Sequence, residues 1–197
     1  MFYLMEKGGP IMWPLLLTSV VSLTVVLERL YFITATHLKR QPKTVEAMLA
    51  GVERGNVRDA IEAGKDSADF VAKVLVEGLK HREVGLSNAL LRASNRELQH
   101  FNQGLSILDT VVTLAPLLGL LSTVTGMIRA FGLLGGHELD APTVITGGIA
   151  EALIGTAFGL GIAVVALIPF NYLNARLEEA RHELEDTTTH LELLLKS

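Results

Sequence analysis

The chain has 197 residues, of which 49% are hydrophobic and 19% are charged, below the roughly one quarter that is usual in soluble domains. The absence of cysteine excludes a disulfide framework and a thiolate metal site, and the net charge of −4 comes without a basic cluster suited to nucleic acid. This balance predicts a protein whose partner is the lipid bilayer and not a nucleic acid.

Three stretches are long and apolar enough to cross a membrane, since a helix needs about 20 apolar residues to span a hydrocarbon core of about 30 Å. The first is 11–33 and the second is 107–128. The third, 141–175, holds a single charge, Glu151, and is long enough to project beyond the bilayer. The pattern predicts an all-α, polytopic membrane protein with three transmembrane helices.

Lysine and arginine favour the cytoplasmic side and therefore predict the orientation. They gather in 37–103 and recur after residue 175, whereas 133–142 has none. We therefore expect the middle segment and the C-terminus in the cytoplasm, with the N-terminus and the 133–142 loop on the opposite side. The expected segments are an N-terminal segment 1–10, transmembrane helix 11–36, cytoplasmic helical region 37–106, transmembrane helix 107–132, loop 133–142, transmembrane helix 143–173 and cytoplasmic helix 174–197.

Amphipathic spacing predicts helices outside the membrane as well. In the middle segment they are 44–54, 57–63, 70–80 and 86–101, of which the last is expected to run into the second span. In the tail, Leu177, Leu184 and Leu191 recur at heptad spacing, which is typical of a helix that packs on a neighbouring helix.

Glu151 is the first candidate for function. A carboxylate inside a membrane helix costs about 2.5–3.5 kcal/mol on insertion scales, so such residues usually face a bundle interior or a water-filled path. The alternative is structural, a hydrogen-bonded glutamate that only locks a subunit interface. Asp109 and Arg129, near the two ends of the second span, are expected to anchor it at the membrane surface.

Small residues, which let helices approach closely, recur along both later spans. The second span has Ala115, Gly119, Ser122, Gly126 and Ala130, and the third has Gly147, Gly155 and Gly159 in one four-residue series with Glu151. Thr123 lies at the edge of the first stripe. Thr156 lies about 140° around the helix from Glu151, so we expect one of these two residues to face a pore and the other a contact between subunits.

No residue pattern supports an enzyme, a cofactor or a metal site. The six histidines lack metal-ligand spacing, and the sequence contains no phosphate-binding loop and no nucleophile motif.

Two runs carry a resemblance to a known family. The run TLAPLLGLLSTVTGMIRAF (113–131) resembles the second transmembrane helix of the MotA/TolQ/ExbB proton-channel family, and GIAEALIGTAFGL (148–160) resembles its third. The similarity covers nearly the whole chain and is closer to ExbB and TolQ than to flagellar MotA, since three spans are found and not four. The family's pore threonines match Thr123 and Thr156, and its helix-three glutamate matches Glu151. Ser122 stands where many members have glycine.

The resemblance implies a homopentamer in the bacterial inner membrane, with the N-terminus in the periplasm. Its central pore would hold the single transmembrane helices of an ExbD- or TolR-like dimer, whose membrane aspartate carries the proton. The resulting work would reach a TonB- or TolA-like protein that spans the periplasm, for envelope transport or maintenance.

The leading hypothesis is therefore a proton-channel stator subunit, in which Thr123 and Thr156 line the path and Glu151 is a wall or interface residue. A sodium-driven stator remains open, with extra oxygens from Ser122, Thr125 and Thr146. A non-conducting membrane scaffold, in which the small-residue stripes serve only oligomer packing, is the third interpretation.

Overall fold

The structure is a computed structural model that describes residues 8–132 and 141–196, the side chains of 141–145 excepted. Its described residues form helices joined by short turns and contain no strand. The helices are α2 (Met12–Leu38), α3 (Pro42–Glu53), α4 (Val57–Gly64), α5 (Phe70–Lys80), α6 (Arg82–Asn102), α7 (Leu105–Gly132) and α8 (Ala141–Lys196). The prediction of an all-α chain is confirmed, while most of the expected 1–10 segment and 133–142 loop lies outside the described residues.

Among the described residues, three helices are long and apolar enough to cross a membrane, as the sequence predicts. They are α2, α7 and the part of α8 from Thr146 onward. α8 is one uninterrupted helix of 56 residues that passes through Pro169. At about 1.5 Å per residue it is far longer than a hydrocarbon core of about 30 Å, so part of it must extend outside the membrane.

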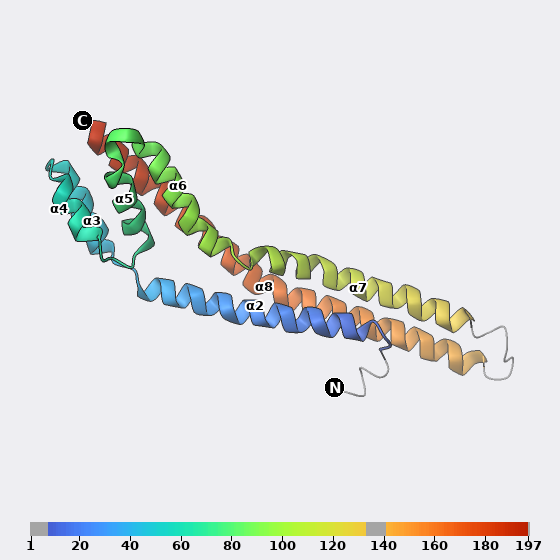
Figure 1. Cartoon of the computed structure of the whole chain (residues 1–197). Helices are drawn as coiled ribbons and strands as arrows, with labels where there is room; N and C mark the ends of the chain where they lie inside the picture. The colour runs from blue at the N-terminus through green and yellow to red at the C-terminus, as the bar shows by residue number, and fades with distance from the viewer. Residues whose placement is uncertain (1–7, 133–140, 197) are drawn as a thin grey trace. The chain divides into compact units, whose positions relative to one another are not determined.

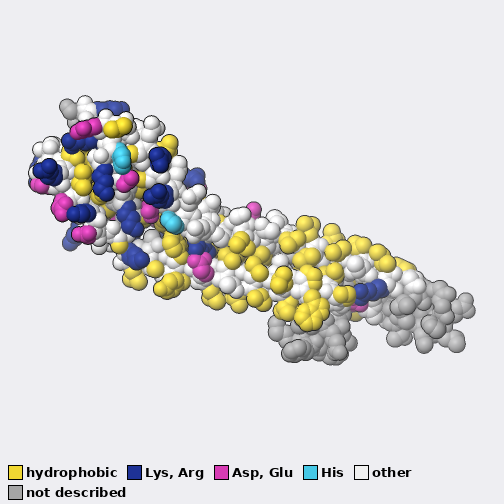
Figure 2. Space-filling view, in the orientation of Figure 1, with side chains coloured by type: hydrophobic (Ala, Val, Ile, Leu, Met, Phe, Trp, Pro, Cys, Tyr) yellow, Lys and Arg dark blue, Asp and Glu magenta, His cyan; other side chains and the backbone are white. Residues whose placement is uncertain are grey.

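The chain divides into two compact units. The first is Met1–Glu28 with Gly104–Tyr172, and the second is Arg29–Gln103 with Leu173–Ser197. In the first unit, α2, α7 and α8 run side by side (Figure 1). The space-filling view shows hydrophobic side chains over the visible face of these three helices and charged side chains gathered on α3 to α6 (Figure 2). This distribution fits burial of the first unit in lipid.

The second unit has its own apolar core, built from α3 to α6 and the C-terminal part of α8. Met48 of α3 and Leu75 of α5 are fully buried in it. Leu184 and Leu191 of α8, two of the residues with heptad spacing, are 1% and 0% exposed. The heptad positions of the tail therefore pack on helices of the same chain.

A buried carboxylate ties the helices of the second unit together. Asp69, 1% exposed, precedes α5 and accepts hydrogen bonds from the backbone N–H of Val71 at 2.9 Å and of Gln41 at 2.7 Å. Its carboxylate also pairs with Arg40 at 2.9 Å, and Arg40 makes a second ion pair with Glu183 of α8. One acidic side chain thus caps α5 and joins it to the start of α3 and, through arginine, to α8.

The expectation that the 86–101 helix runs into the second span is wrong. α6 ends at Asn102, Gln103 has an extended ψ of 136°, and Gly104 follows with φ +77°. That left-handed conformation suits glycine and is a common way for a helix to end. The Gly104 carbonyl oxygen then accepts from the N–H of Leu108 at 3.1 Å, which starts α7 as a separate helix.

Candidate functional site

The small residues of α7 form one side of a tight seam between α7 and α8. Ala115, Gly119, Ser122, Gly126 and Ala130 are the buried residues of α7 from its middle to its end. Their partners on α8 are Gly148, Ala152, Gly155 and Gly159. Contacts run in opposite directions along the two helices, from Ala115 with Gly159 to Ala130 with Gly148, so the hairpin is antiparallel.

Along the seam, the backbone of α7 lies directly against the backbone of α8. A Cβ added at Gly126 would lie 2.9 Å from the Gly148 carbonyl oxygen, and one at Gly155 would overlap the Ser122 hydroxyl. Gly147, which strict four-residue spacing placed on this face, instead points into open space within the chain. The seam on α8 follows alternating steps of four and three residues, because that alternation stays on one face of a helix with 3.6 residues per turn.

Thr156 is the polar residue that crosses the seam. Its hydroxyl donates to the carbonyl oxygen of Gly119 on α7 at 2.9 Å and to that of Ala152 on its own helix at 3.1 Å. The side chain is half-buried. A hydroxyl has one proton and two lone pairs, so with its proton directed at these carbonyls the oxygen can still accept a hydrogen bond.

Two threonine hydroxyls of α7 bond within their own helix. Thr123 donates to the Leu120 carbonyl oxygen at 2.6 Å, and Thr125 donates to that of Leu121 at 2.9 Å. Such bonds satisfy the hydroxyl in an apolar setting and leave its oxygen available as an acceptor. The structure places both threonines off the seam, half-buried on the flanks of α7.

Glu151 is paired with Arg129, a partner that sequence reasoning missed. Arg129 Nη1 of α7 lies 2.7 Å from Glu151 Oε1 of α8. Arg129 was expected only to anchor the helix end. The signal that would have found the pair is the antiparallel register, since the seam contact of Gly126 with Ala152 lies next to it. Opposite charges at facing positions of a hairpin then pair.

Glu151 and Thr156 both reach α7 of the same chain, at positions ten residues apart. Thr156 contacts Gly119, and Glu151 contacts Arg129. Ten residues correspond to about 15 Å along a helix, so the carboxylate and the hydroxyl act at different depths of the hairpin. Their angular separation places them on the two flanks of the seam.

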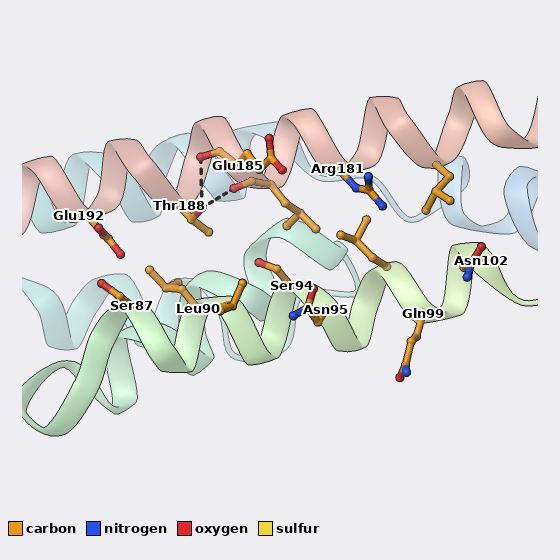
Figure 3. A pocket seen from close by; sticks show the side chains of 14 residues that line it. Ser87, Leu90, Ser94, Asn95, Gln99, Asn102, Arg181, Glu185, Thr188 and Glu192 are labelled. Atoms are coloured by element: carbon orange, nitrogen blue, oxygen red, sulfur yellow. Dashed lines mark hydrogen bonds between the residues drawn. The ribbon is translucent and has the colours of Figure 1, made fainter.

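The second unit holds a groove of about 810 Å³ between α6 and α8 (Figure 3). Leu90 and Leu184 are among its apolar lining residues, and Asn95, Gln99 and Glu185 are among its polar ones. Its polar groups do not converge on a reactive site. Within residues 8–132 and 141–196, moreover, no group of three or more His, Cys, Asp or Glu side chains is arranged to hold a metal ion. The candidate site is therefore the α7–α8 hairpin.

Comparison with known proteins identifies relatives of this hairpin and its flanking helices. Residues 65–186 match the sequence profile of the MotA/TolQ/ExbB proton channel family. A putative biopolymer transport protein, ExbB-like 1 of Synechocystis, is 33% identical over 197 residues, covering 96% of this chain and 77% of the relative.

Two further relatives come from other bacteria. The Tol-Pal system protein TolQ of Haemophilus influenzae is 27% identical over 81% of this chain and 75% of its own length. The biopolymer transport protein exbB1 of Vibrio cholerae is 28% identical over 98% of this chain and 87% of its own length.

Proposed function

The chain belongs to the MotA/TolQ/ExbB proton channel family, and from this premise we propose that it is a channel-forming stator subunit that couples the proton motive force to mechanical work on an envelope-spanning partner. The observation that carries the proposal is the hydrogen bond from Thr156 to the Gly119 carbonyl oxygen, at 2.9 Å, which crosses the seam of small residues between α7 and α8. It fixes an acceptor oxygen at a defined position along the two candidate spans.

The hydroxyls of Thr123 and Thr156 determine which groups the proposed proton path can bind. A carboxyl group that carries a proton across a membrane is a donor only while it is protonated. Thr123 and Thr156, whose own protons are directed at carbonyl oxygens, offer it acceptor oxygens on α7 and α8. These contacts would stabilise the protonated carboxyl of a partner helix, in the manner of the ExbD- or TolR-like dimer that the family implies.

The assembly is part of the proposal. We expect a homopentamer in the bacterial inner membrane, with the N-terminus in the periplasm and the C-terminus in the cytoplasm. Large apolar side chains on the spans, such as Leu117 at 61% and Leu153 at 62% exposed, must be covered by lipid, by neighbouring copies or by the partner's helices. A TonB- or TolA-like protein would receive the work, since relatives bear biopolymer transport and Tol-Pal names.

The arrangement of the hydroxyls supports protons over sodium. A sodium ion needs several oxygens around a space of its own. Ser122 is 1% exposed and faces Gly155 in the tightest part of the seam. Thr125 is bonded to its own helix at Leu121. The Ser122 oxygen is therefore enclosed by packed atoms and has no space beside it for an ion.

The test is ion flux in liposomes that contain the chain together with an ExbD- or TolR-like protein that has a single transmembrane helix with a membrane aspartate. We expect proton flux that requires the partner and that continues without sodium. Flux that requires sodium would establish the sodium-driven stator, and a complex that forms without any flux would establish the scaffold.

A further inference from the structure

The ion pair of Arg129 and Glu151 lies beside the seam in a fixed register. The guanidinium and the carboxylate are 2.7 Å apart, and the Glu151 side chain is 22% exposed. Gly126 and Gly148 next to the pair are held backbone to backbone, since a Cβ on Gly126 would lie 2.9 Å from the Gly148 carbonyl oxygen. The two backbones therefore approach too closely here to admit a side chain between them, and the ion pair lies beside this close contact.

The turn before α2 also contacts the Glu151 carboxylate. A Cβ at Gly9 would overlap Oε1 of Glu151, and Gly9 has φ +70°, where glycine is favoured. The Gly9 carbonyl oxygen accepts from the N–H of Met12 at 3.1 Å, so Gly9 lies in the turn that leads into α2. The starts of α2 and α8 and the end of α7 thus meet at one acidic side chain.

The positive charge of Arg129 compensates the negative charge of Glu151. Glu151 is the only charged residue in 141–175, and a carboxylate without a partner is costly in an apolar setting. The guanidinium of arginine is a permanent cation with a donor fork that matches a carboxylate. Arg129 therefore compensates the charge of Glu151 and points it toward Gly9, about 15 Å along α7 from the Thr156 contact at Gly119.

We propose that Arg129 and Glu151 form a charge-paired lock, in which Arg129 is a positioning residue that holds Glu151 against the start of α2. The inference rests on the proposed function. Glu151 then supports conduction by fixing the hairpin and α2 in register, and the conducted ion passes along the threonine hydroxyls without residing on Glu151.

Partner-dependent proton flux in liposomes tests the lock through charge exchange. Arg129→Gln and Glu151→Gln should each lower the flux about tenfold, a loss equivalent to about one strong interaction. The exchanged variant Arg129→Glu with Glu151→Arg restores an ion pair but leaves no carboxylate at position 151. We expect it to recover at least about half of the wild-type flux. Flux in the exchanged variant no higher than in Glu151→Gln overturns the lock, because Glu151 then serves as an ion carrier.

A second measurement separates the lock from the conduction proposal. Thermal unfolding of the purified chain in detergent should show that the effects of the two glutamine substitutions do not add. The unfolding equilibrium constant of the double variant should be about fivefold smaller than the value expected from the two single variants. Strict additivity overturns the lock whatever the flux. If the variants show this coupling but the wild-type chain conducts no protons with its partner, the proposed function is refuted and the ion pair remains supported.

Discussion

The Thr156 hydroxyl of α8 and the Gly119 carbonyl oxygen of α7 are 2.9 Å apart and form a hydrogen bond across the seam of small residues. The contact exists because Gly119 has no side chain, so that the Thr156 backbone approaches closely enough for a Cβ at Gly119 to lie 3.1 Å from the Thr156 Cα. Close packing and polar chemistry are therefore supplied by the same pair of residues.

Replacing this hydroxyl should affect conduction far more than folding. Hydrogen bonds between membrane helices contribute only about 0.6 kcal/mol on average, so Thr156→Val should fold almost normally. We expect its partner-dependent proton flux to fall roughly tenfold or more, since an acceptor oxygen on the path is lost. Thr156→Ser keeps the oxygen and should keep most of the flux.

The matched control for that experiment is Thr125→Val. Thr125 also bears a hydroxyl on the hairpin, but it bonds only to carbonyl oxygens of its own helix, those of Leu121 at 2.9 Å and Ser122 at 3.2 Å. Equal losses of flux in the two valine variants would show that Thr156 has no special place on the path.

The seam itself predicts a contrast between two glycines of α8. A Cβ at Gly159 would lie 2.5 Å from the Ala115 carbonyl oxygen and 2.9 Å from the Gly119 Cα, both of them backbone atoms that cannot rotate away. Gly159→Ala should therefore destabilise the hairpin by about 1–3 kcal/mol, as overpacking usually does. Unfolding of the purified chain in bicelles measures the change.

Gly161→Ala is the control, because no atom lies within 4 Å of a Cβ at Gly161. Both substitutions gain the same helix propensity, about 1 kcal/mol over glycine, so this gain cancels in the comparison. A Gly159→Ala variant as stable as Gly161→Ala would mean that the two helices approach less closely than the seam requires.

Local sequence patterns predicted the helices well, because the formation of a helix depends mainly on residues that are close together along the chain. Apolar length alone identified α2, α7 and α8, and the amphipathic stretch 70–80 coincides with α5, Phe70–Lys80. The break between α6 and α7 was missed although Gly104 was visible as a helix-ending residue. The amphipathic stretch 86–101 ends shortly before it, and spacing alone does not reveal a backbone turn between two helices.

Contacts between helices were harder to predict, because they depend on register as well as on spacing. The stripe on α7 was recognisable, but its counterpart on α8 runs through Gly148 and Ala152 and leaves Gly147 in open space. The same missing register hid the pairing of Arg129 with Glu151, whose positions are 22 residues apart in the sequence. A lone charge in a long apolar helix indicated function, and the hairpin geometry supplied its partner.

In the second unit, removal of the buried carboxylate of Asp69 should be costly. Asp69→Ala leaves the backbone N–H groups of Gln41 and Val71 without their acceptor and breaks the ion pair to Arg40. We expect a loss of about 1–3 kcal/mol, the usual penalty for buried donors left unsatisfied. For a chain of this size that corresponds to a fall of roughly 2–4 °C in Tm for each kcal/mol. Asp66→Ala, at an exposed position three residues earlier, should leave the Tm unchanged, and a similar fall in both variants would contradict the role of Asp69.

Two leucines of α8 distinguish a packed tail from an exposed one. Leu184 is 1% exposed in the core of the second unit, whereas Leu193 on the same helix is 62% exposed. Leu184→Ala should lose about 2–5 kcal/mol, because the transfer energy of the side chain and the cavity it leaves both count. Leu193→Ala should stay within about 0.5 kcal/mol of the wild type. Limited proteolysis of the detergent-purified chain reports the difference as faster cleavage of the tail in Leu184→Ala alone. If Leu193→Ala were cleaved equally fast, the tail would be held by contacts on its other face, and the packing of the heptad leucines on α5 and α6 would not be what anchors it.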